Sequence, residues 1–285
     1  MIFTLLIIMI IVIILFVLAQ NYKMYTYKYY PWNKCLINDQ NKLINTFNKY
    51  GCVIIPNILT HSDCDKILEL IEKEEKNKNN ITSSINSNYK RKDLLLSLNK
   101  MKYDIKNIYT TIKYFCDNIT PNGKIVECSS LISYPGCYPQ IWHSDTNFIS
   151  NNEGNLVSFG IALNDITPQM GPLEIYLESN NIYKNIDHLI DKFNIDTEDN
   201  LNGNYDDGIK KQPIEDLCKI LKFKKKKSSC QKGSLIIWSS KIIHRGGANN
   251  EKKRPVFYFS VLGEGEKPYG ATYSLKNNTE YIQKL

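Results

Sequence analysis

The sequence predicts a mainly β protein with flanking helices, of the sandwich or jelly-roll type, attached to one N-terminal transmembrane helix. Three observations lead to this prediction. From Gly123 onward, short β-branched or aromatic runs are separated by glycine, proline and asparagine, which is typical of an antiparallel β domain. Before that point, apolar residues recur at helical spacing in three stretches between residues 35 and 116. The chain also begins with a long apolar run.

The N-terminal run, Ile2–Ala19, is apolar apart from Thr4 and carries no charge. As a helix it would rise roughly 27 Å, close to the thickness of a hydrocarbon core. A cleaved signal peptide is the alternative, because Val17-Leu-Ala19 is an acceptable cleavage context. No basic residue precedes the run, however, and it is longer than an ordinary signal core. We therefore expect residues 1–20 to form a retained single-pass membrane anchor and residues 21–34 a juxtamembrane linker.

Lysines follow this anchor, and only the terminal amine precedes it. The positive-inside rule then places the following domain in the cytosol. Formal glycosylation sequons at Asn80, Asn118 and Asn277 leave a lumenal location open, although such sequons arise by chance in an asparagine-rich chain.

The net charge of +7 comes mostly from scattered lysines. The densest basic run, residues 222–227, is interpreted as a lysine-guarded strand edge or loop rather than a contact with an anionic membrane or nucleic acid. No nucleic-acid motif accompanies it, so no nucleic-acid partner is expected. The eight cysteines lack CxxC spacing, which predicts scattered buried thiols.

Residues 35–285 are expected to form one domain, with a helical part at 35–120 and a β core at 123–263. Within the helical part, residues 51–56 are predicted as a strand, residues 76–92 as a polar loop, and residues 94–116 as helix. Thr60 is a predicted N-cap, with Asp63 in a capping-box-like position. The β core has eight candidate strands: 124–134, 138–145, 155–164, 173–178, 226–230, 234–239, 241–245 and 255–262. Residues 180–228 are interpreted as an insertion, either a lid or a surface loop.

The candidate site begins with His143 and Asp145, whose i, i+2 spacing on a predicted strand points both side chains to one face. His244 ends another apolar strand and is followed by paired glycines. Two imidazoles and one carboxylate leave three positions open on an iron(II) ion. Arg254 opens the next strand, and a buried guanidinium there would need an anion, for example a carboxylate of a dicarboxylate cosubstrate.

These residues leave other hypotheses open. The domain could be a non-catalytic, membrane-tethered jelly-roll binding domain, or the two histidines and the aspartate could hold a structural zinc ion. Arg254 could form a surface salt bridge instead of binding a cosubstrate.

Residues 50–263 resemble the iron(II)- and 2-oxoglutarate-dependent oxygenases, most closely the phytanoyl-CoA dioxygenase family. The resemblance lies in the order and spacing of several motifs. These are Gly51-Cys-Val-Ile-Ile-Pro-Asn-Ile-Leu59, Gln140-Ile-Trp-His-Ser-Asp145, Ala162-Leu-Asn-Asp165 with Gly171-Pro-Leu-Glu174, and His244-Arg-Gly-Gly-Ala-Asn249 followed by Arg254.

The resemblance implies a double-stranded β-helix in which His143, Asp145 and His244 hold iron(II) and Arg254 binds 2-oxoglutarate. Molecular oxygen would be the second cosubstrate, and ascorbate could serve as a reductant. The implied reaction is hydroxylation of an unidentified small-molecule, lipid or protein substrate, with release of succinate and carbon dioxide. Related halogenases carry a small residue in place of the metal-binding carboxylate, so Asp145 favours hydroxylation.

The chain also departs from the family pattern. Gly246 stands where relatives often carry a hydroxyl that helps to hold the cosubstrate, and Tyr134 could supply a replacement hydroxyl. Trp142 and Trp238 are interpreted as core residues, and Asn249 as a residue that shapes the turn after His244.

Overall fold

The structure, a computed structural model, describes residues 39–76, 81–83, 90–146, 152–180, 182, 188–189, 192, 213–271, 273–275 and 279–285. The predicted anchor at residues 1–20, the predicted linker at 21–34 and most of the predicted insertion lie outside these described residues. Within the described ranges, no helix combines the length and the apolar character that crossing a bilayer requires.

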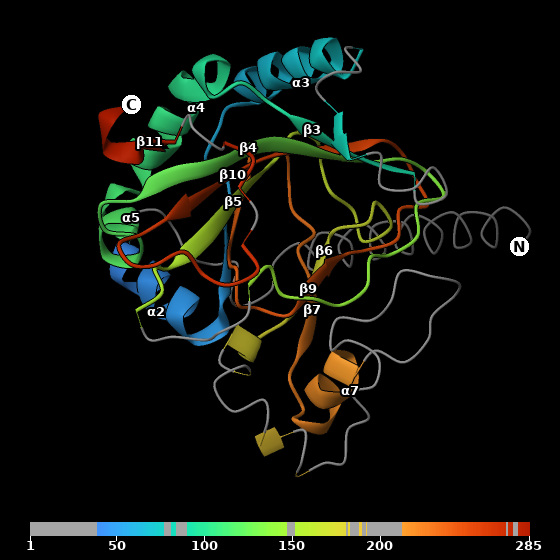
Figure 1. Ribbon diagram of the computed structural model, residues 1–285. Coiled ribbons are helices and arrows are strands. Elements are labelled where there is room, and N and C mark those ends of the chain that lie inside the picture. Colours follow the sequence, from blue (N-terminus) through green and yellow to red (C-terminus); the bar gives the residue numbers. More distant parts are fainter. Residues whose placement is uncertain are drawn as a thin grey trace, which may run out of the picture.

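Four helices lie against one face of a large sheet (Figure 1). They are α2 (Gln40–Tyr50), α3 (His61–Glu75), α4 (Leu98–Thr111) and α5 (Lys113–Ile119). The predicted cap of α3 is confirmed, because the Thr60 hydroxyl accepts a hydrogen bond from the Asp63 backbone N–H at 3.1 Å. A further helix, α7 (Pro213–Ile220), packs near the small sheet.

The strands form two antiparallel sheets, which gives a mainly β, jelly-roll-like fold. The large sheet has the order β1-β8-β5-β10-β4-β3-β2, with β11 also paired to β4. Its strands are β1 (Cys52–Ile55), β8 (Leu235–Ser239), β5 (Leu156–Ala162), β10 (Arg254–Leu262), β4 (Lys124–Ser133), β3 (Arg91–Leu95), β2 (Ile81–Ser83) and β11 (Glu280–Tyr281). The small sheet has the order β7-β6-β9 and consists of β7 (Lys225–Lys227), β6 (Leu173–Tyr176) and β9 (His244–Gly246).

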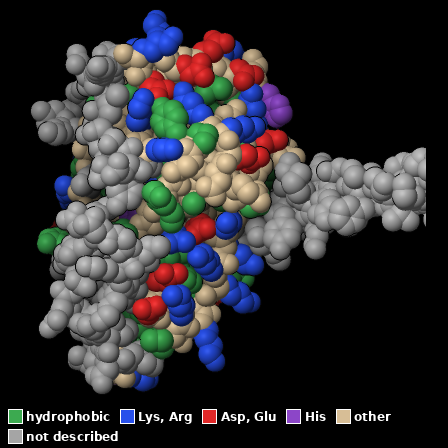
Figure 2. All heavy atoms as spheres, turned by 90° about the vertical axis from the view of Figure 1, so that its right-hand side faces the viewer, with side chains coloured by type: hydrophobic (Ala, Val, Ile, Leu, Met, Phe, Trp, Pro, Cys, Tyr) green, Lys and Arg blue, Asp and Glu red, His purple; other side chains and the backbone are tan. Residues whose placement is uncertain are grey.

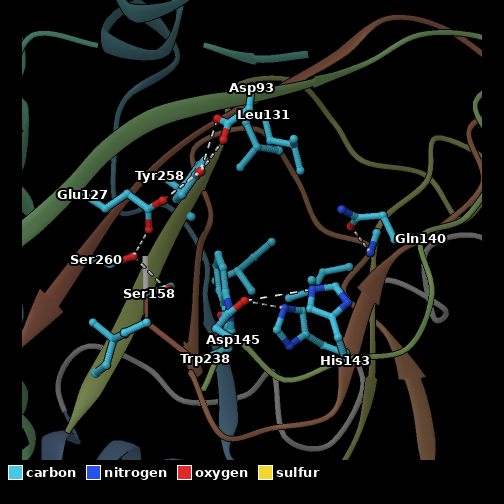
Figure 3. A pocket seen from close by; sticks show the side chains of 18 of the residues that line it. Asp93, Glu127, Leu131, Gln140, His143, Asp145, Ser158, Trp238, Tyr258 and Ser260 are labelled. Carbon is cyan, nitrogen blue, oxygen red and sulfur yellow. Dashed lines mark hydrogen bonds and ion pairs between the residues drawn. The ribbon is translucent and has the colours of Figure 1, made fainter. Parts of the chain in front are cut away.

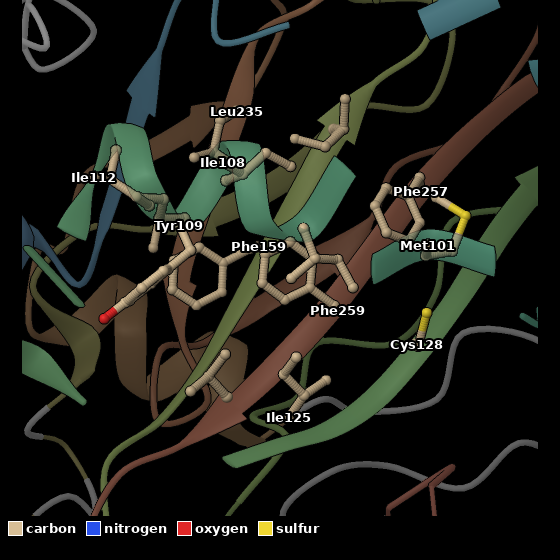
Figure 4. Packing of buried hydrophobic residues seen from close by; sticks show 14 of the residues in the cluster. Met101, Ile108, Tyr109, Ile112, Ile125, Cys128, Phe159, Leu235, Phe257 and Phe259 are labelled. Carbon is tan, nitrogen blue, oxygen red and sulfur yellow. The ribbon is translucent and has the colours of Figure 1, made fainter. Parts of the chain in front are cut away.

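Alternation along the central strand β10 gives the large sheet two chemically different faces. Phe257 and Phe259 point toward the helices and join the main apolar core, where Phe159 of β5 stacks on Phe259 at 5.0 Å between ring centroids (Figure 4). The intervening residues of β10 line a cavity that the small sheet also borders, and they are Arg254, Val256, Tyr258 and Ser260. One strand therefore supplies both the core and the wall of the cavity.

A β-bulge interrupts the pairing of β4 with β10. Ser260 pairs with Glu127, but the next residue, Val261, pairs with Ile125, so that Val126 is an extra residue in β4. Ile125 then lies in the core under the helices, whereas Val126 packs with Leu156 and Ala271 in a separate apolar cluster.

Three sequence predictions of local structure need correction. Residues 138–145 do not form a strand, because Pro139 lacks a backbone N–H and the segment bonds to β9 only at intervals, through an isolated bridge between His143 and His244. The expected loop at 76–92 and helix from 94 also need correction. Residues 91–95 form β3, which pairs with β4, and α4 begins only at Leu98.

Other expectations are confirmed. Within the basic run, β7 is an edge strand of the small sheet, and Lys225 and Lys227 form ion pairs with Glu174 of β6. The seven cysteines that the structure describes are all buried and free. On the face shown in Figure 2, lysine and arginine side chains are mixed with aspartate and glutamate side chains, so that face carries no uniform basic field.

Truncating the core at Phe159, which is fully buried, should destabilise the protein strongly. We expect Phe159→Ala to lower the free energy of unfolding by about 3–5 kcal/mol, because it leaves a cavity beside Phe259 and Phe115. Urea unfolding measures this change. Tyr103→Ala removes an aromatic ring that is 71% exposed and should cost less than about 1 kcal/mol; equal losses for the two variants would contradict the assigned core.

Candidate metal and cosubstrate site

Three potential metal ligands converge on one end of the cavity (Figure 3). Asp145 Oδ1 lies 3.5 Å from His244 Nε2 and 4.0 Å from His143 Nε2, and the three ligand atoms all lie within 4.8 Å of one another. A single ion with ligand bonds of about 2.0–2.2 Å can bridge such a set after small adjustments. The three predicted residues are therefore brought together, even though the segment that carries two of them is not a regular strand.

Backbone pairing produces this convergence. The His143 N–H donates to the His244 carbonyl at 3.0 Å, and the His244 N–H donates back to the His143 carbonyl at 2.8 Å. The Asp145 N–H instead donates to the Ser240 carbonyl at 2.8 Å, which turns the chain so that the carboxylate faces the rings.

The same backbone fixes the tautomer of both rings. His143 Nδ1 lies 2.8 Å from the Ile141 carbonyl, and His244 Nδ1 lies 2.9 Å from the Ile242 carbonyl. A carbonyl can only accept a hydrogen bond, so each Nδ1 carries the proton and each Nε2 presents its lone pair to the shared space. Burial, reinforced by the neighbouring His244, lowers the pKa of His143 to about 4. The donor set therefore fits a divalent metal ion at neutral pH.

Trp238 packs against an apolar core cluster, as predicted, and also belongs to this site. Its indole Nε1–H donates to Asp145 Oδ2 at 3.4 Å, and its rings lie 6.2 Å from the His244 ring. This hydrogen bond occupies Oδ2, so Oδ1 remains available and faces the two histidines. Trp142 is fully buried against Tyr176, as expected of a core residue.

Arg254 lines the same cavity and is buried with 4% of its surface exposed. Its Nε–H donates to the Ser133 hydroxyl at 3.2 Å, and no carboxylate in the described part of the chain forms an ion pair with it. Burial, followed by the charge of the nearby Arg91, lowers the pKa of Arg254 to about 9. A buried cation without a carboxylate partner favours binding of an anion from outside the protein. The surface salt bridge that the sequence left open for Arg254 does not form among the described residues.

Arg91, which the sequence did not single out, is a second buried cation beside Arg254. Its Nη2 donates to the carbonyls of Tyr138, Gly246 and Gly247 at 3.1, 3.2 and 2.7 Å. Its Nε and Nη1 have no hydrogen-bond partner among the described residues. The adjacent pair of guanidinium groups strengthens the attraction of this end of the cavity for a carboxylate.

The structure explains why a glycine occupies position 246. A Cβ built on Gly246 would lie 2.5 Å from Arg91 Nη1 and 2.7 Å from Gln140 Oε1. Gln140 also accepts a hydrogen bond from the Gly246 N–H at 2.8 Å and lines the cavity. Arg91 and Gln140 therefore fill the space that a side chain at 246 would need.

Tyr134 is not brought to the site. Its hydroxyl donates to Glu75 of α3, and the ammonium groups of Lys92 and Lys253 lie over its ring. These contacts hold the phenol on the helix side of β4, and Tyr134 does not line the cavity. Asn249 does shape the turn after His244, because its side-chain amide donates to the carbonyls of Ser133 and Lys252 at 3.1 and 2.8 Å.

The cavity, of about 240 Å³, also has a carboxylate-rich wall that the sequence did not reveal. Glu127 of β4 accepts hydrogen bonds from the hydroxyls of Ser260 at 2.7 Å and Tyr258 at 3.2 Å. Asp93 of β3 lies 3.3 Å from the same Tyr258 hydroxyl. Burial, with the nearby charges of Asp145 and Asp93, raises the pKa of Glu127 to about 7.

Comparison with known proteins agrees with this site. The sequence matches the family model described as phytanoyl-CoA dioxygenase (PhyH) over residues 47–256, which is more than half of the chain. The chain belongs to the phytanoyl-CoA dioxygenase family. No sequence among the curated proteins matches it significantly.

Several solved structures share the fold of this family member. One is the non-heme alpha ketoglutarate dependent carbocyclase SnoK from nogalamycin biosynthesis, with 11% identity, a TM-score of 0.58, and coverage of 85% of this chain and 89% of that chain. Another is the epimerase SnoN in complex with Fe3+, alpha ketoglutarate and nogalamycin RO, with 12% identity, a TM-score of 0.56, and coverage of 79% and 84%. A third is HygX from Streptomyces hygroscopicus with nickel and 2-oxoglutarate bound, with 10% identity, a TM-score of 0.54, and coverage of 81% and 94%.

Glu127 should make the stability of the metal-free protein depend on pH. A carboxyl group with a pKa of about 7 when folded and 4.5 when unfolded binds its proton more tightly in the folded state. Its stabilising contribution is then complete below pH 4.5 and is lost as the pH rises toward 7, a loss on the order of 2–3 kcal/mol.

Glu127→Gln should remove this component, so the difference in unfolding free energy between wild type and variant should change between pH 5 and pH 7.5. Urea unfolding in the presence of a chelator measures it. Glu215 of α7 also accepts a hydrogen bond from a tyrosine hydroxyl, that of Tyr176, but lies outside the cavity. Glu215→Gln is thus the matched control, and a pH-independent difference for Glu127→Gln would contradict the raised pKa.

Proposed function

We propose that this protein is an iron(II)- and 2-oxoglutarate-dependent dioxygenase that hydroxylates its substrate and releases succinate and carbon dioxide. The observation that carries the proposal is the presence, in one cavity, of three convergent metal-binding atoms and a buried arginine without an anionic partner among the described residues. Membership of the phytanoyl-CoA dioxygenase family supports it.

The proposed metal ligands are His143 Nε2, His244 Nε2 and Asp145 Oδ1. Bound iron(II) would supply the activation of oxygen, since two imidazoles and one carboxylate leave coordination positions open. The carbonyls of Ile141 and Ile242 hold the ring protons on Nδ1. These second contacts fix ring orientation and raise the basicity of the ligating nitrogens.

The proposed partner of Arg254 is the distal carboxylate of 2-oxoglutarate. The Ser133 hydroxyl fixes the guanidinium at its Nε, which leaves the remaining N–H groups for a carboxylate. In the overall reaction, two electrons come from a substrate C–H bond and two from the oxidative decarboxylation of 2-oxoglutarate. One oxygen atom of O2 enters the new hydroxyl group, and the other enters succinate.

Hydroxylation is the proposed outcome because Asp145 occupies the carboxylate position of the ligand set. The solved structures that share the fold include a carbocyclase and an epimerase, so the product must be identified directly. We also assign the two-sheet arrangement to the double-stranded β-helix class, which the sheet order supports.

Removing one imidazole should abolish metal binding and turnover together. His143→Ala should weaken iron(II) binding at least a hundredfold and eliminate succinate formation, because one of three ligands is lost. Anaerobic iron(II) titration and succinate release in air are the measurements. His61→Ala, at an exposed helix start, is the control and should behave as wild type. Wild-type protein that holds zinc tightly but never releases succinate would favour the structural-zinc hypothesis instead.

Removing the guanidinium should affect the cosubstrate rather than the metal. Arg254→Ala should raise the 2-oxoglutarate concentration for half-maximal succinate formation at least tenfold while iron(II) affinity changes less than about twofold, since a bidentate charged contact is lost. Arg245→Ala is the matched control, because Arg245 pairs with Glu174 at 2.7 Å and does not line the cavity. An unchanged requirement for 2-oxoglutarate in Arg254→Ala would refute its role.

We further propose that residues 1–20 anchor the enzyme in a membrane with the catalytic domain in the cytosol. The uncharged run Ile2–Ala19 and the lysines after it support this proposal. The full chain should remain in the membrane fraction after alkaline carbonate extraction, whereas a chain that lacks residues 2–20 should be released. Digestion of the catalytic domain by protease added to intact vesicles with the cytosolic face outward tests its orientation.

A further inference from the structure

The carboxylate-rich wall has a chemistry that binding of iron and 2-oxoglutarate does not explain. We define the acidic wall as Asp93, Glu127, Tyr258, Ser260 and Ser158, all of which line the cavity (Figure 3). Within the part of the chain that the structure describes, the Glu127 carboxylate contacts only the hydroxyls of Tyr258 and Ser260, and no cationic side chain pairs with it. Burial of an ionised carboxylate without a cation is costly, so this group favours a positively charged ligand.

The Glu127 carboxylate has more acceptor capacity than its two hydroxyl neighbours supply. The Tyr258 hydroxyl lies 3.2 Å from Glu127, and a phenol has a single proton to donate. The Ser260 hydroxyl is 2.7 Å from Glu127 and 3.0 Å from the Ser158 hydroxyl. An ammonium group brings three donors and a positive charge, which suits this excess of acceptors.

Glu127 and Ser260 of the acidic wall, which pair with each other in the sheet, lie away from the cosubstrate arginine. Arg254 begins β10 and Ser260 lies six residues further along the same strand, which is about 20 Å in an extended chain. The indole of Trp238, which donates to the metal-binding carboxylate, extends over Gly160, and Gly160 pairs with Tyr258, so the metal site lies between Arg254 and Ser260 along β10. The negative charge of Asp145 also contributes to the raised pKa of Glu127. A substrate that binds the acidic wall would therefore adjoin the metal without displacing the cosubstrate.

We propose that the acidic wall binds the ammonium group of a cationic, amine-bearing small-molecule substrate and so determines which C–H bond faces the metal. This inference rests on the proposed dioxygenase function and adds the class of substrate to it. It makes substrates with a carboxylate or phosphate at this position unfavourable, because like charges would meet in a buried space.

The test compares three five-carbon probes of different charge, namely pentylamine, 1-pentanol and pentanoate. Calorimetric titration uses the full chain with nickel(II) in place of iron and with 2-oxoglutarate present, so that no turnover occurs. Pentylamine should bind at least tenfold more tightly than 1-pentanol, and pentanoate should bind more weakly than either. Glu127→Gln should lower the affinity for pentylamine about tenfold and change that for 1-pentanol less than about twofold.

Two further variants complete the design. Glu215→Gln removes a carboxylate outside the cavity and should leave all three affinities unchanged. Asp93→Asn removes the other carboxylate of the wall and should also reduce the preference for pentylamine, so the inference remains testable if Glu127→Gln fails to fold.

The possible outcomes separate this inference from the function on which it rests. Equal binding of pentylamine and 1-pentanol by wild type, or an unchanged preference in both wall variants, would overturn the inference. If the protein binds metal and 2-oxoglutarate and releases succinate in that case, the dioxygenase function stands. If it prefers the amine but binds neither metal nor 2-oxoglutarate, the acidic wall stands as a cation site and the dioxygenase function fails.

Discussion

Two reciprocal backbone hydrogen bonds between His143 and His244 hold the candidate site together. They join segments about a hundred residues apart and set both imidazoles side by side, with ring centroids 4.6 Å apart. The backbone also supplies the carbonyls that hold each ring proton on Nδ1. The ligand geometry therefore depends on main-chain pairing at an otherwise irregular edge of the small sheet, rather than on a regular strand.

Around this pairing, the cavity is polarised along β10. Arg254 and the adjacent Arg91 give one end a positive charge, and Glu127, which pairs with Ser260, gives the other a negative charge. Along β10, the residues that line the cavity alternate with Phe257 and Phe259, which join the main apolar core. The same strand therefore serves ligand binding with the side chains of one face and stability with the side chains of the other face.

The sequence predicted the metal ligands and Arg254 because each belongs to a motif that residue types and their spacing along the chain identify without knowledge of tertiary contacts. It predicted most strands of the β core for the same reason, since short β-branched runs between turn residues are a local signal. The Asp145-bound Trp238, the buried Arg91 and the acidic wall have no such signal. Their positions follow from the register of β3, β4, β5, β8 and β10, which depends on pairings between distant segments. Tyr134 shows how a prediction from sequence position alone can fail. It directly follows Ser133 at the end of β4, but its side chain points away from the cavity, toward Glu75 of α3.

The β-bulge between β4 and β10 has a consequence for electrostatic screening. The extra residue Val126 directly precedes Glu127 in the chain and packs against Leu156 and Ala271. Hydrocarbon groups therefore border the Glu127 carboxylate at that end of the cavity. Such a border keeps mobile counterions at a distance, and buried charges are screened far less by dissolved salt than charges on an open surface. Discrimination between ligands of opposite charge should therefore persist at ionic strengths that screen the charges on the exterior of the protein.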